Sequence, residues 1–252
     1  MTVSAPLKVS RLAAEADQSR DLHTHSDGQL YWLEQGAIFC RSDRYHWLTA
    51  PRQLSWIPPG CQHGARPLSM VRGTLLHLRE DLAFAMPQEP VTLEPHRLLE
   101  ATLLRLIELC PESDWLERHE HLLQVFLSEA REATPLRQRL PMPHDARLLR
   151  MANTLWRAPE SNPGLDALAL EFGFSRRTLT RKFMQETGMS LSQWTQHAKL
   201  LRALELLAAN ESVSSAAFAV GYQSVSTFCA VFKQVFGMSP GDYKRRFLSR
   251  EK

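Results

Sequence analysis

Three histidines in the first quarter of the chain have the residue type and spacing that a metal site needs. His23 and His25 are two positions apart, so both imidazoles project from the same side of an extended strand. Gln29 follows four residues later, and His63 comes after the tight turn predicted at residues 58–60. Imidazole nitrogens and an amide oxygen can together bind a divalent metal ion. The same side chains can instead line a polar pocket or hydrogen-bond to strand edges, and both interpretations stay open.

A second set of side chains, near the C-terminus, is suited to bind nucleic acid. Guanidinium groups donate paired hydrogen bonds to guanine edges and to phosphates, and one predicted helix presents three arginines on one face. The candidate residues there are Ser175, Arg176, Arg177, Thr180 and Arg181. A second predicted helix presents a more neutral set, which comprises Gln223, Ser224, Ser226, Thr227 and Lys233. In the basic tail, Lys244 and Arg245 are a candidate phosphate clamp.

The elements that carry these two helices form an internal repeat. Residues 167–190 and 215–240 match at five downstream positions with a constant offset of 49. Each copy contains an alanine four residues before a glycine, at Ala169–Gly173 and Ala217–Gly221. The alanine lets two helices cross closely, and the glycine suits a corner with φ > 0. Each copy therefore predicts a helix-turn-helix whose second helix begins at a polar cap.

One long amphipathic helix is predicted between the two copies, over residues 191–209. A stiff spacer of this kind can place both second helices on one side of a DNA duplex. They would then lie in successive major grooves, about 34 Å apart. A helical bundle with an accidental repeat is the alternative, and the matched corners and exposed arginines make it the weaker explanation.

The C-terminal region from Leu165 to Phe247 resembles the DNA-binding domain of AraC/XylS-family regulators. The resemblance rests on the segments FGFSRRTLTRKF and VGYQSVSTFCAVFKQVFGMSPGDYKRR, of which GMSPGDYKRR is especially specific. It implies a double helix-turn-helix joined by a long helix, which binds direct-repeat half-sites. One departure is Ala230, because a basic residue is common at that position in the second motif. The resemblance therefore implies fewer phosphate contacts from the second motif.

The first third of the chain predicts closely spaced strands, because short alternating apolar runs are separated by glycine and proline. Such strands predict a small antiparallel barrel or sandwich. The pattern HxHxxxQ…PxGxxH in residues 20–78 resembles cupin barrels, in which two histidines, a carboxylate or glutamine, and a later histidine bind a divalent metal. Gln29 stands where glutamate is usual, and a neutral amide binds a cation less well. Fused to this kind of DNA-binding domain, such a barrel implies a small effector, bound beside the four polar residues. Trp32, Trp47, Trp56 and Phe39 can form the apolar wall of that pocket, although aromatic residues on alternating strands more often belong to the core.

Two amphipathic helices follow the predicted strands. One covers residues 96–109, and the other begins at Asp114, where Glu117 completes a variant of the capping box. Their apolar stripes can pack on the barrel or can pair two chains into a homodimer, and the sequence leaves both open. Residues 134–143 hold three prolines and lack periodicity, which predicts a linker.

These elements predict an α+β protein with two domains, an N-terminal small cupin-like β-barrel plus helices and a C-terminal all-α double helix-turn-helix. The expected divisions are an effector-sensing barrel over residues 1–94, a helical dimerisation segment over 95–133, a linker over 134–143 and a DNA-binding domain over 144–252.

Composition and charge are consistent with this organisation. The chain has 252 residues, of which 44% are hydrophobic and 23% are charged, as in soluble globular proteins. No apolar run approaches the ~20 residues of a membrane span, and the N-terminus lacks a secretory pattern, so we expect a cytoplasmic protein without a membrane partner. Residues 1–140 hold 15 basic and 18 acidic side chains, whereas residues 141–252 hold 15 and 9. The basic second half favours a polyanionic partner.

The sequence therefore predicts a transcription regulator rather than an enzyme, with double-stranded DNA, a small effector, a second copy of the chain and, for an activator, RNA polymerase as partners. The segments GQLYW and SWIPPGCQHG resemble short AraC-type regulators that often control a neighbouring efflux transporter gene. A metal-dependent cupin enzyme with a DNA-binding appendage is the alternative, but it needs a pocket carboxylate and Asp27 is the only obvious one. An architectural DNA binder is a third possibility, against which the base-reading arginine face argues.

Overall fold

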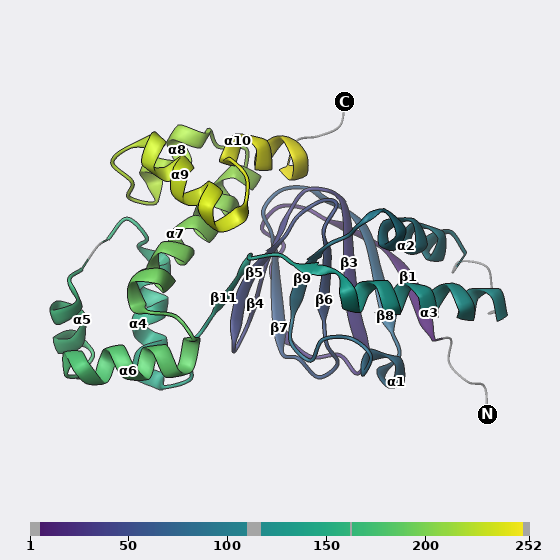
Figure 1. Cartoon of the computed structure of the whole chain (residues 1–252), viewed down its shortest axis with the longest axis horizontal. Coiled ribbons are helices and arrows are strands. Elements are labelled where there is room, and N and C mark those ends of the chain that lie inside the picture. Colours follow the sequence, from purple (N-terminus) through teal and green to yellow (C-terminus); the bar gives the residue numbers. More distant parts are fainter. Residues whose placement is uncertain (1–5, 110–116, 162, 249–252) are drawn as a thin grey trace. The chain divides into compact units, whose positions relative to one another are not determined.

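The computed structural model describes residues 6–109, 117–161 and 163–248. Two compact units divide the chain: one comprises Met1–Cys40 and Thr49–Leu136, and the other comprises Arg41–Leu48 and Arg137–Glu251. Figure 1 traces the strands of the first unit and the helices of the second. The expected α+β architecture with two domains is confirmed.

The first unit is built on a six-stranded antiparallel sheet in the order β1-β8-β3-β6-β9-β10. Its strands are β1 (Leu7–Ala14), β3 (Gly28–Gln35), β6 (Leu54–Ile57), β8 (Val71–Leu78), β9 (Val91–Glu94) and β10 (Thr134–Pro135). A separate sheet contains β2 (Arg20–His23), β4 (Ile38–Ser42) and β7 (His63–Pro67), in which β2 pairs with β7 in antiparallel fashion.

The expectation of a closed barrel is corrected by this topology. Within the described residues, the six-stranded sheet ends at β1 on one side and at β10 on the other. The pairing of β2 with β7 is interrupted by a register shift between Arg20 and His23. The strands therefore form open, sandwich-like sheets, because neither outer strand of the large sheet continues its ladder into the other sheet.

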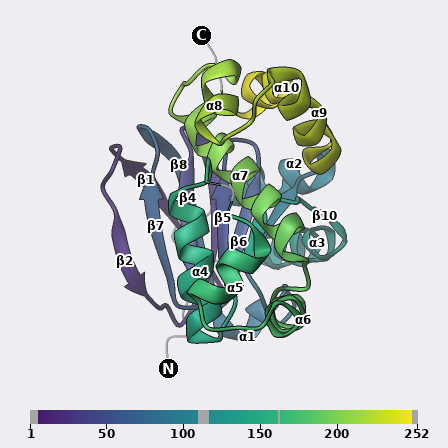
Figure 2. The ribbon, with the colours of Figure 1, turned by 90° about the vertical axis from the view of Figure 1, so that its left-hand side faces the viewer.

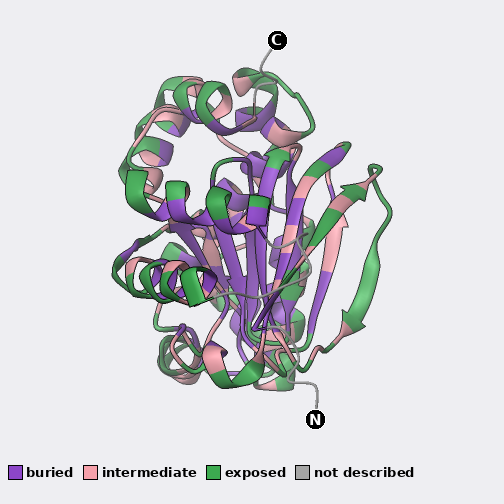
Figure 3. Cartoon of the chain, turned by 90° about the vertical axis from the view of Figure 1, so that its right-hand side faces the viewer, coloured by how far each residue is buried: buried purple, intermediate pink, exposed green. Residues whose placement is uncertain are grey.

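The two predicted amphipathic helices pack on the large sheet. They are α2 (Arg97–Leu109) and α3 (Glu117–Glu132), and their apolar stripes join one buried cluster with alternate side chains of the strands. That cluster includes Leu30, Trp32, Leu54, Trp56, Leu76, Leu99, Leu103, Phe126 and Leu127. Figure 3 shows the central strands mostly buried, with exposed residues on the helices and on the outer strands β1 and β2. Asp114, the expected helix cap, lies outside the described residues, and a short helix α1 (Glu80–Ala83) follows β8.

The second unit is helical, apart from an antiparallel pair formed by β5 (Tyr45–Thr49) and β11 (Arg139–Pro141). Its helices are α4 (Ala146–Arg157), α5 (Leu165–Glu171), α6 (Arg176–Thr187), α7 (Leu191–Ala208), α8 (Val213–Ala219), α9 (Val225–Phe236) and α10 (Pro240–Tyr243), followed by a π-helical turn over Lys244–Leu248. In Figure 2, α7 runs between the α5–α6 pair and the α8–α9 pair. The long predicted spacer is thus confirmed as one helix.

No described helix has both the length and the apolar composition that crossing a membrane requires.

Candidate functional site

The first helix-turn-helix has the predicted corner. Gly173 has φ of 70°, which a side chain disfavours and glycine tolerates. Ala169 is buried, and its carbonyl oxygen accepts the backbone N–H of Phe174 at 2.8 Å, which closes the turn. The side chain of Ser175 then accepts the backbone N–H of Thr178, so α6 begins at the expected cap.

The second helix-turn-helix repeats this geometry. Gly221 has φ of 83°, and the Ala217 carbonyl oxygen accepts the backbone N–H of Tyr222 at 3.1 Å. Ser224 caps α9 by accepting the backbone N–H of Thr227. The sequence repeat is therefore also a repeat of backbone conformation.

The candidate nucleic-acid-binding side chains lie on exposed faces. On α6 and at its cap, these are Ser175, Arg176, Arg177, Thr180 and Arg181, and on α9 they are Gln223, Ser224, Ser226, Thr227 and Lys233. Arg176 forms an ion pair with Asp166 at 3.3 Å, and both side chains are exposed. Because exposed ion pairs contribute little free energy, Arg176 can exchange this partner for a phosphate or a base at small cost.

The side chains of the basic tail form contacts within the chain that the sequence does not indicate. Lys244 Nζ donates to the carbonyl oxygens of Asn210 and Glu211, at 3.1 and 2.8 Å, just beyond the end of α7. Arg245 is exposed but forms an ion pair with Asp242. At least two of the three Lys244 donors are thus used within the chain.

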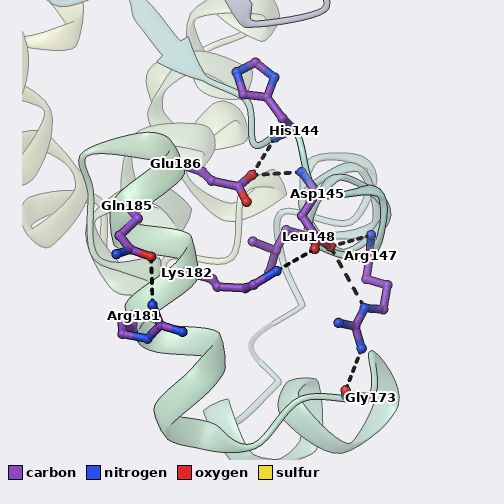
Figure 4. Close-up of polar contacts among 9 residues, drawn as sticks. All are labelled: His144, Asp145, Arg147, Leu148, Gly173, Arg181, Lys182, Gln185 and Glu186. Carbon is purple, nitrogen blue, oxygen red and sulfur yellow. Dashed lines mark hydrogen bonds and ion pairs between the residues drawn. The ribbon is translucent and has the colours of Figure 1, made fainter.

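A polar network that the sequence analysis missed ties α6 to the start of α4 (Figure 4). Asp145 caps α4 by accepting the backbone N–H groups of Arg147 and Leu148, and it also accepts from Lys182 Nζ at 2.9 Å. Glu186 accepts the backbone N–H groups of His144 and Asp145 at 2.7 and 2.9 Å. The hydrogen bond from Lys182, supported by the backbone donors, lowers the pKa of Asp145 to about 2. The network therefore restrains α6 on the side opposite its exposed arginines.

Arg147, which also lies on α4, contacts the corner of the first helix-turn-helix. Its Nη1 donates to the Gly173 carbonyl oxygen at 2.8 Å, and its guanidinium carbon lies 4.0 Å from the centroid of the Phe174 ring. These contacts could not be predicted from local sequence patterns in residues 144–187, because they join residues that are 26 to 42 positions apart.

In the first unit, the three histidines come together. Ring centroids lie 4.9 Å apart for His23 and His25, 4.7 Å for His23 and His63, and 5.5 Å for His25 and His63. One potential ligand atom from each residue lies within 4.8 Å of the others. His63 is buried, whereas His23 and His25 are partly exposed. The strand pair β2–β7 brings these groups together, since His23 and His63 are register partners.

Two of these imidazoles form a hydrogen bond to a backbone carbonyl oxygen through Nδ1. Nδ1 of His23 is 2.7 Å from the Asp21 carbonyl oxygen, and Nδ1 of His63 is 3.0 Å from that of Cys61. A carbonyl oxygen only accepts, so Nδ1 is the hydrogen-bond donor in both rings. Burial lowers the pKa of His63, and burial together with the neighbouring imidazoles lowers that of His25. Both shifts favour the neutral form of His25 and His63.

Comparison with known proteins agrees with both halves of this description. Residues 7–137 match the model of the AraC-like ligand binding domain, and residues 168–246 match that of a helix-turn-helix domain. The chain belongs to the AraC family of transcriptional regulators.

Among relatives of this AraC-family chain is the HTH-type transcriptional regulator NimR of Escherichia coli (strain K12). It is 29% identical over 225 residues, which cover 89% of this chain and 82% of that protein. The HTH-type transcriptional activator RhaR of Pectobacterium carotovorum subsp. carotovorum (strain PC1) is 35% identical over 133 residues, 52% of this chain and 46% of that protein. The solved structure of ToxT from Vibrio cholerae aligns with 97% of this chain and 100% of that one, at a TM-score of 0.42 and 10% identity.

The remaining residues expected in the effector pocket of this AraC-family chain are distributed over two faces of the sheet. Gln29 is buried, and its Oε1 accepts from the Tyr31 hydroxyl at 3.2 Å. Trp32 and Trp56, expected in the pocket wall, lie instead in the core beneath α2 and α3. The reason is the alternation of side chains along a strand, which places Trp32 on the face opposite Gln29. The structure therefore does not bring the two tryptophans to the histidines.

His77 on β8 is a neighbour that the sequence analysis missed. It is the register partner of Gln29, and its ring centroid lies 6.3 Å from that of His25. The Asp27 carboxylate raises the pKa of His77, although burial outweighs this and lowers it overall. The sequence did contain a pattern that indicates this position, because His77 is a polar residue between Leu76 and Leu78. Side chains alternate along a strand, so His77 lies on the face opposite these core leucines.

Proposed function

We propose that this AraC-family regulator reads DNA sequence with α6 and α9. The observation that supports the proposal is the pair of matching corners, each of which presents an exposed second helix with polar side chains. Arg176, Arg177, Thr180 and Arg181 on α6 would supply most base and phosphate contacts. The more neutral α9 would add contacts from Gln223, Ser224, Ser226, Thr227 and Lys233. Lys244 and Arg245 would contact phosphates of the DNA backbone.

In the same proposal, residues 1–94 sense a small effector and residues 144–252 bind DNA. Residues 134–143 connect them, and within this connection Thr134–Pro135 and Arg139–Pro141 are paired as the short strands β10 and β11. The effector site is the polar face that carries His23, His25, Gln29 and His63. Effector binding would shift the population between forms of the protein that differ in DNA affinity. The regulator would act in the cytoplasm, and the gene that it controls would be that of a neighbouring efflux transporter. If it is an activator, it would also contact RNA polymerase.

We further propose that the segment 95–133 pairs two chains. The inner stripes of α2 and α3 are used by the chain's own core, which leaves Leu98, Leu104 and Val125 as large exposed apolar side chains. Sedimentation equilibrium of the full chain tests this proposal. A monomer at micromolar concentration, with Val125→Asp behaving identically, would rule it out.

Selection of bound sequences from random duplex DNA with the full-length protein tests the main proposal. We expect enrichment of sites with two contacted segments one helical turn apart. Binding that depends on salt but not on sequence, with and without added divalent metals, would instead indicate an architectural role. Turnover of a small substrate by the metal-loaded protein would favour an enzyme.

A further inference from the structure

A hollow of about 200 Å³ opens between α7 and the corner of the second helix-turn-helix. Side chains on one face of α7 form one wall, and the residues just before α9 form the other. The lining residues are Ser192, Thr195, Gln196, Lys199, Gly221 and Tyr222. Sites that enclose a small-molecule ligand have volumes of about 300–1,000 Å³. The hollow is therefore suited to one group of a larger ligand rather than to a whole effector.

The polar side chains of this hollow can donate hydrogen bonds. Ser192 and Tyr222 contribute hydroxyl groups, Gln196 contributes an amide and Lys199 contributes an ammonium. None of these four has a hydrogen-bond or ion-pair partner among the described residues. Thr195 differs, since its hydroxyl donates to a backbone carbonyl oxygen within α7. Four unused donors without a carboxylate in the lining suit an anionic group.

The titratable groups of the hollow also favour an anion. Burial lowers the pKa of the Lys199 ammonium, and the exposed carboxylate of Glu160 partly opposes this shift. A bound anion would oppose it further, because a nearby negative charge stabilises the protonated form. Burial raises the pKa of the Tyr222 hydroxyl, so this group keeps its proton and can donate it in a hydrogen bond.

The hollow lies between the two helices that are proposed to enter DNA. α7 joins the two motifs, and Tyr222 directly precedes Gln223, which is expected to contact DNA. When two helices occupy successive major grooves on one side of a duplex, the phosphates along the intervening minor groove face the element that connects them. We propose that the hollow binds one of these phosphates, with Lys199 as the charged group and the other three donors around it. This inference rests on the proposed reading of DNA by α6 and α9.

Duplexes in which one phosphate is replaced by an uncharged methylphosphonate test this inference. The full-length protein is titrated with its selected site, modified at one position at a time between the two contacted segments. We expect one or two of these replacements to reduce wild-type affinity by about 10-fold, and Lys199→Met to cause a similar loss on unmodified DNA. The two changes together should reduce affinity no further than either alone, because both remove the same contact.

The salt dependence of binding gives a second readout. Lys199→Met should reduce the slope of log affinity against log salt concentration by about 1, without changing the base preference. Lys199→Arg keeps the positive charge and should keep the wild-type slope. Tyr222→Phe removes one hydroxyl group, and we expect it to weaken binding by about 2- to 10-fold with the slope unchanged.

Arg150→Met is the matched control for net charge, because Arg150 is exposed on α4 and does not line the hollow. It should lose affinity on the modified duplexes just as the wild type does, and melting curves check that each variant is folded. Equal salt slopes in wild type and Lys199→Met, or a full methylphosphonate effect in Lys199→Met at every position, would overturn this inference while sequence-selective binding remains. A wild-type protein that selects no sequence would instead overturn the proposed function and, with it, this inference.

Discussion

The glycines with positive φ in the second unit are not equivalent. At Gly188 and Gly237, which end α6 and α9, an added Cβ would meet nothing within 4 Å. At Gly173, it would meet only the flexible end of Arg147, at 3.6 Å. At Gly221, it would lie 2.8 Å from the Cα and 3.0 Å from the carbonyl oxygen of Glu160. Gly221 therefore combines a left-handed conformation with a close approach of two backbone segments.

Substitution of these glycines by alanine should separate the two effects. Gly188→Ala should cost about 1–2 kcal/mol of unfolding free energy, because only the left-handed conformation is strained. Gly221→Ala should cost more than about 3 kcal/mol, because the backbone near Glu160 must also move. Urea denaturation followed by circular dichroism measures both values. Equal losses would show that the close approach carries no cost.

Arg177 is exposed on α6, within the face proposed to read DNA. Arg177→Ala should weaken binding to the selected site by about 1–3 kcal/mol and relax preference at one base pair, if the guanidinium binds a guanine. Competition binding with single-base variants of the site measures this effect. Arg150→Ala, on α4 outside both motifs, should leave the preference intact. A loss of equal size on every sequence would make Arg177 a phosphate contact.

The start of α4 shows how one helix terminus restrains another element. The Asp145 carboxylate accepts hydrogen bonds from two backbone N–H groups in the first turn of α4 and from the ammonium of Lys182. Glu186 accepts hydrogen bonds from the backbone N–H groups of His144 and Asp145. Both partners come from α6 and are one turn apart, so the polar side of α6 is attached to α4 at two points. The free energy of the contact between Asp145 and Lys182 depends on the negative charge of the Asp145 carboxylate.

This dependence predicts a difference between wild type and Asp145→Asn that changes with pH. The folded pKa of Asp145, about 2, is below its value of 3.8 in an unfolded chain. Its ionised form therefore stabilises the protein above pH 4, and this contribution is lost as the pH falls toward 2. At pH 7 we expect Asp145→Asn to be less stable by on the order of 1 kcal/mol, with the deficit shrinking below pH 4.

Thermal unfolding from pH 7 to pH 3 measures the deficit. Asp166→Asn is the control, because its carboxylate is in an exposed ion pair with Arg176 and should contribute little at any pH. A deficit for Asp145→Asn that is constant with pH would show that the charge of Asp145 does not contribute.

The two helix-turn-helix motifs belong to one compact unit, joined by the single helix α7. Ser190 and Gln193 form a capping box at its start, and Trp194 packs edge-on against Phe183 of α6, with ring centroids 5.7 Å apart. At its other end, Lys244 binds the carbonyl oxygens beyond α7. A connection of this kind sets a fixed separation between α6 and α9.

The selected DNA site should therefore tolerate no change in spacing between its two contacted segments. Inserting about 5 base pairs turns one segment to the opposite side of the duplex, and inserting about 10 moves it one full turn away. We expect both insertions to reduce affinity by about 10-fold or more, because only one motif can then bind. Gel-shift titration measures the affinities. Normal affinity after the longer insertion would show that α7 does not hold the motifs at one distance.

The corners, caps and spacer helix of the second unit were predictable because each depends on a few neighbouring residues. A glycine four positions after an alanine and a serine before an amphipathic run restrict the backbone locally, and the repeat supplied a second copy of the same evidence. The grouping of His23 with His25 was also local, since side chains alternate along a strand.

Contacts between distant segments were decided by the tertiary structure. The Lys182–Asp145 bond, the approach of Gly221 to Glu160 and the position of His77 beside Gln29 depend on which elements pack together. Alternation already separated Trp32 from Gln29, but only the packing of α2 and α3 on one face of the sheet made that face the core. Local conformational preferences act over a few residues, whereas strand order, register and helix packing are selected by the free energy of burying the chain as a unit.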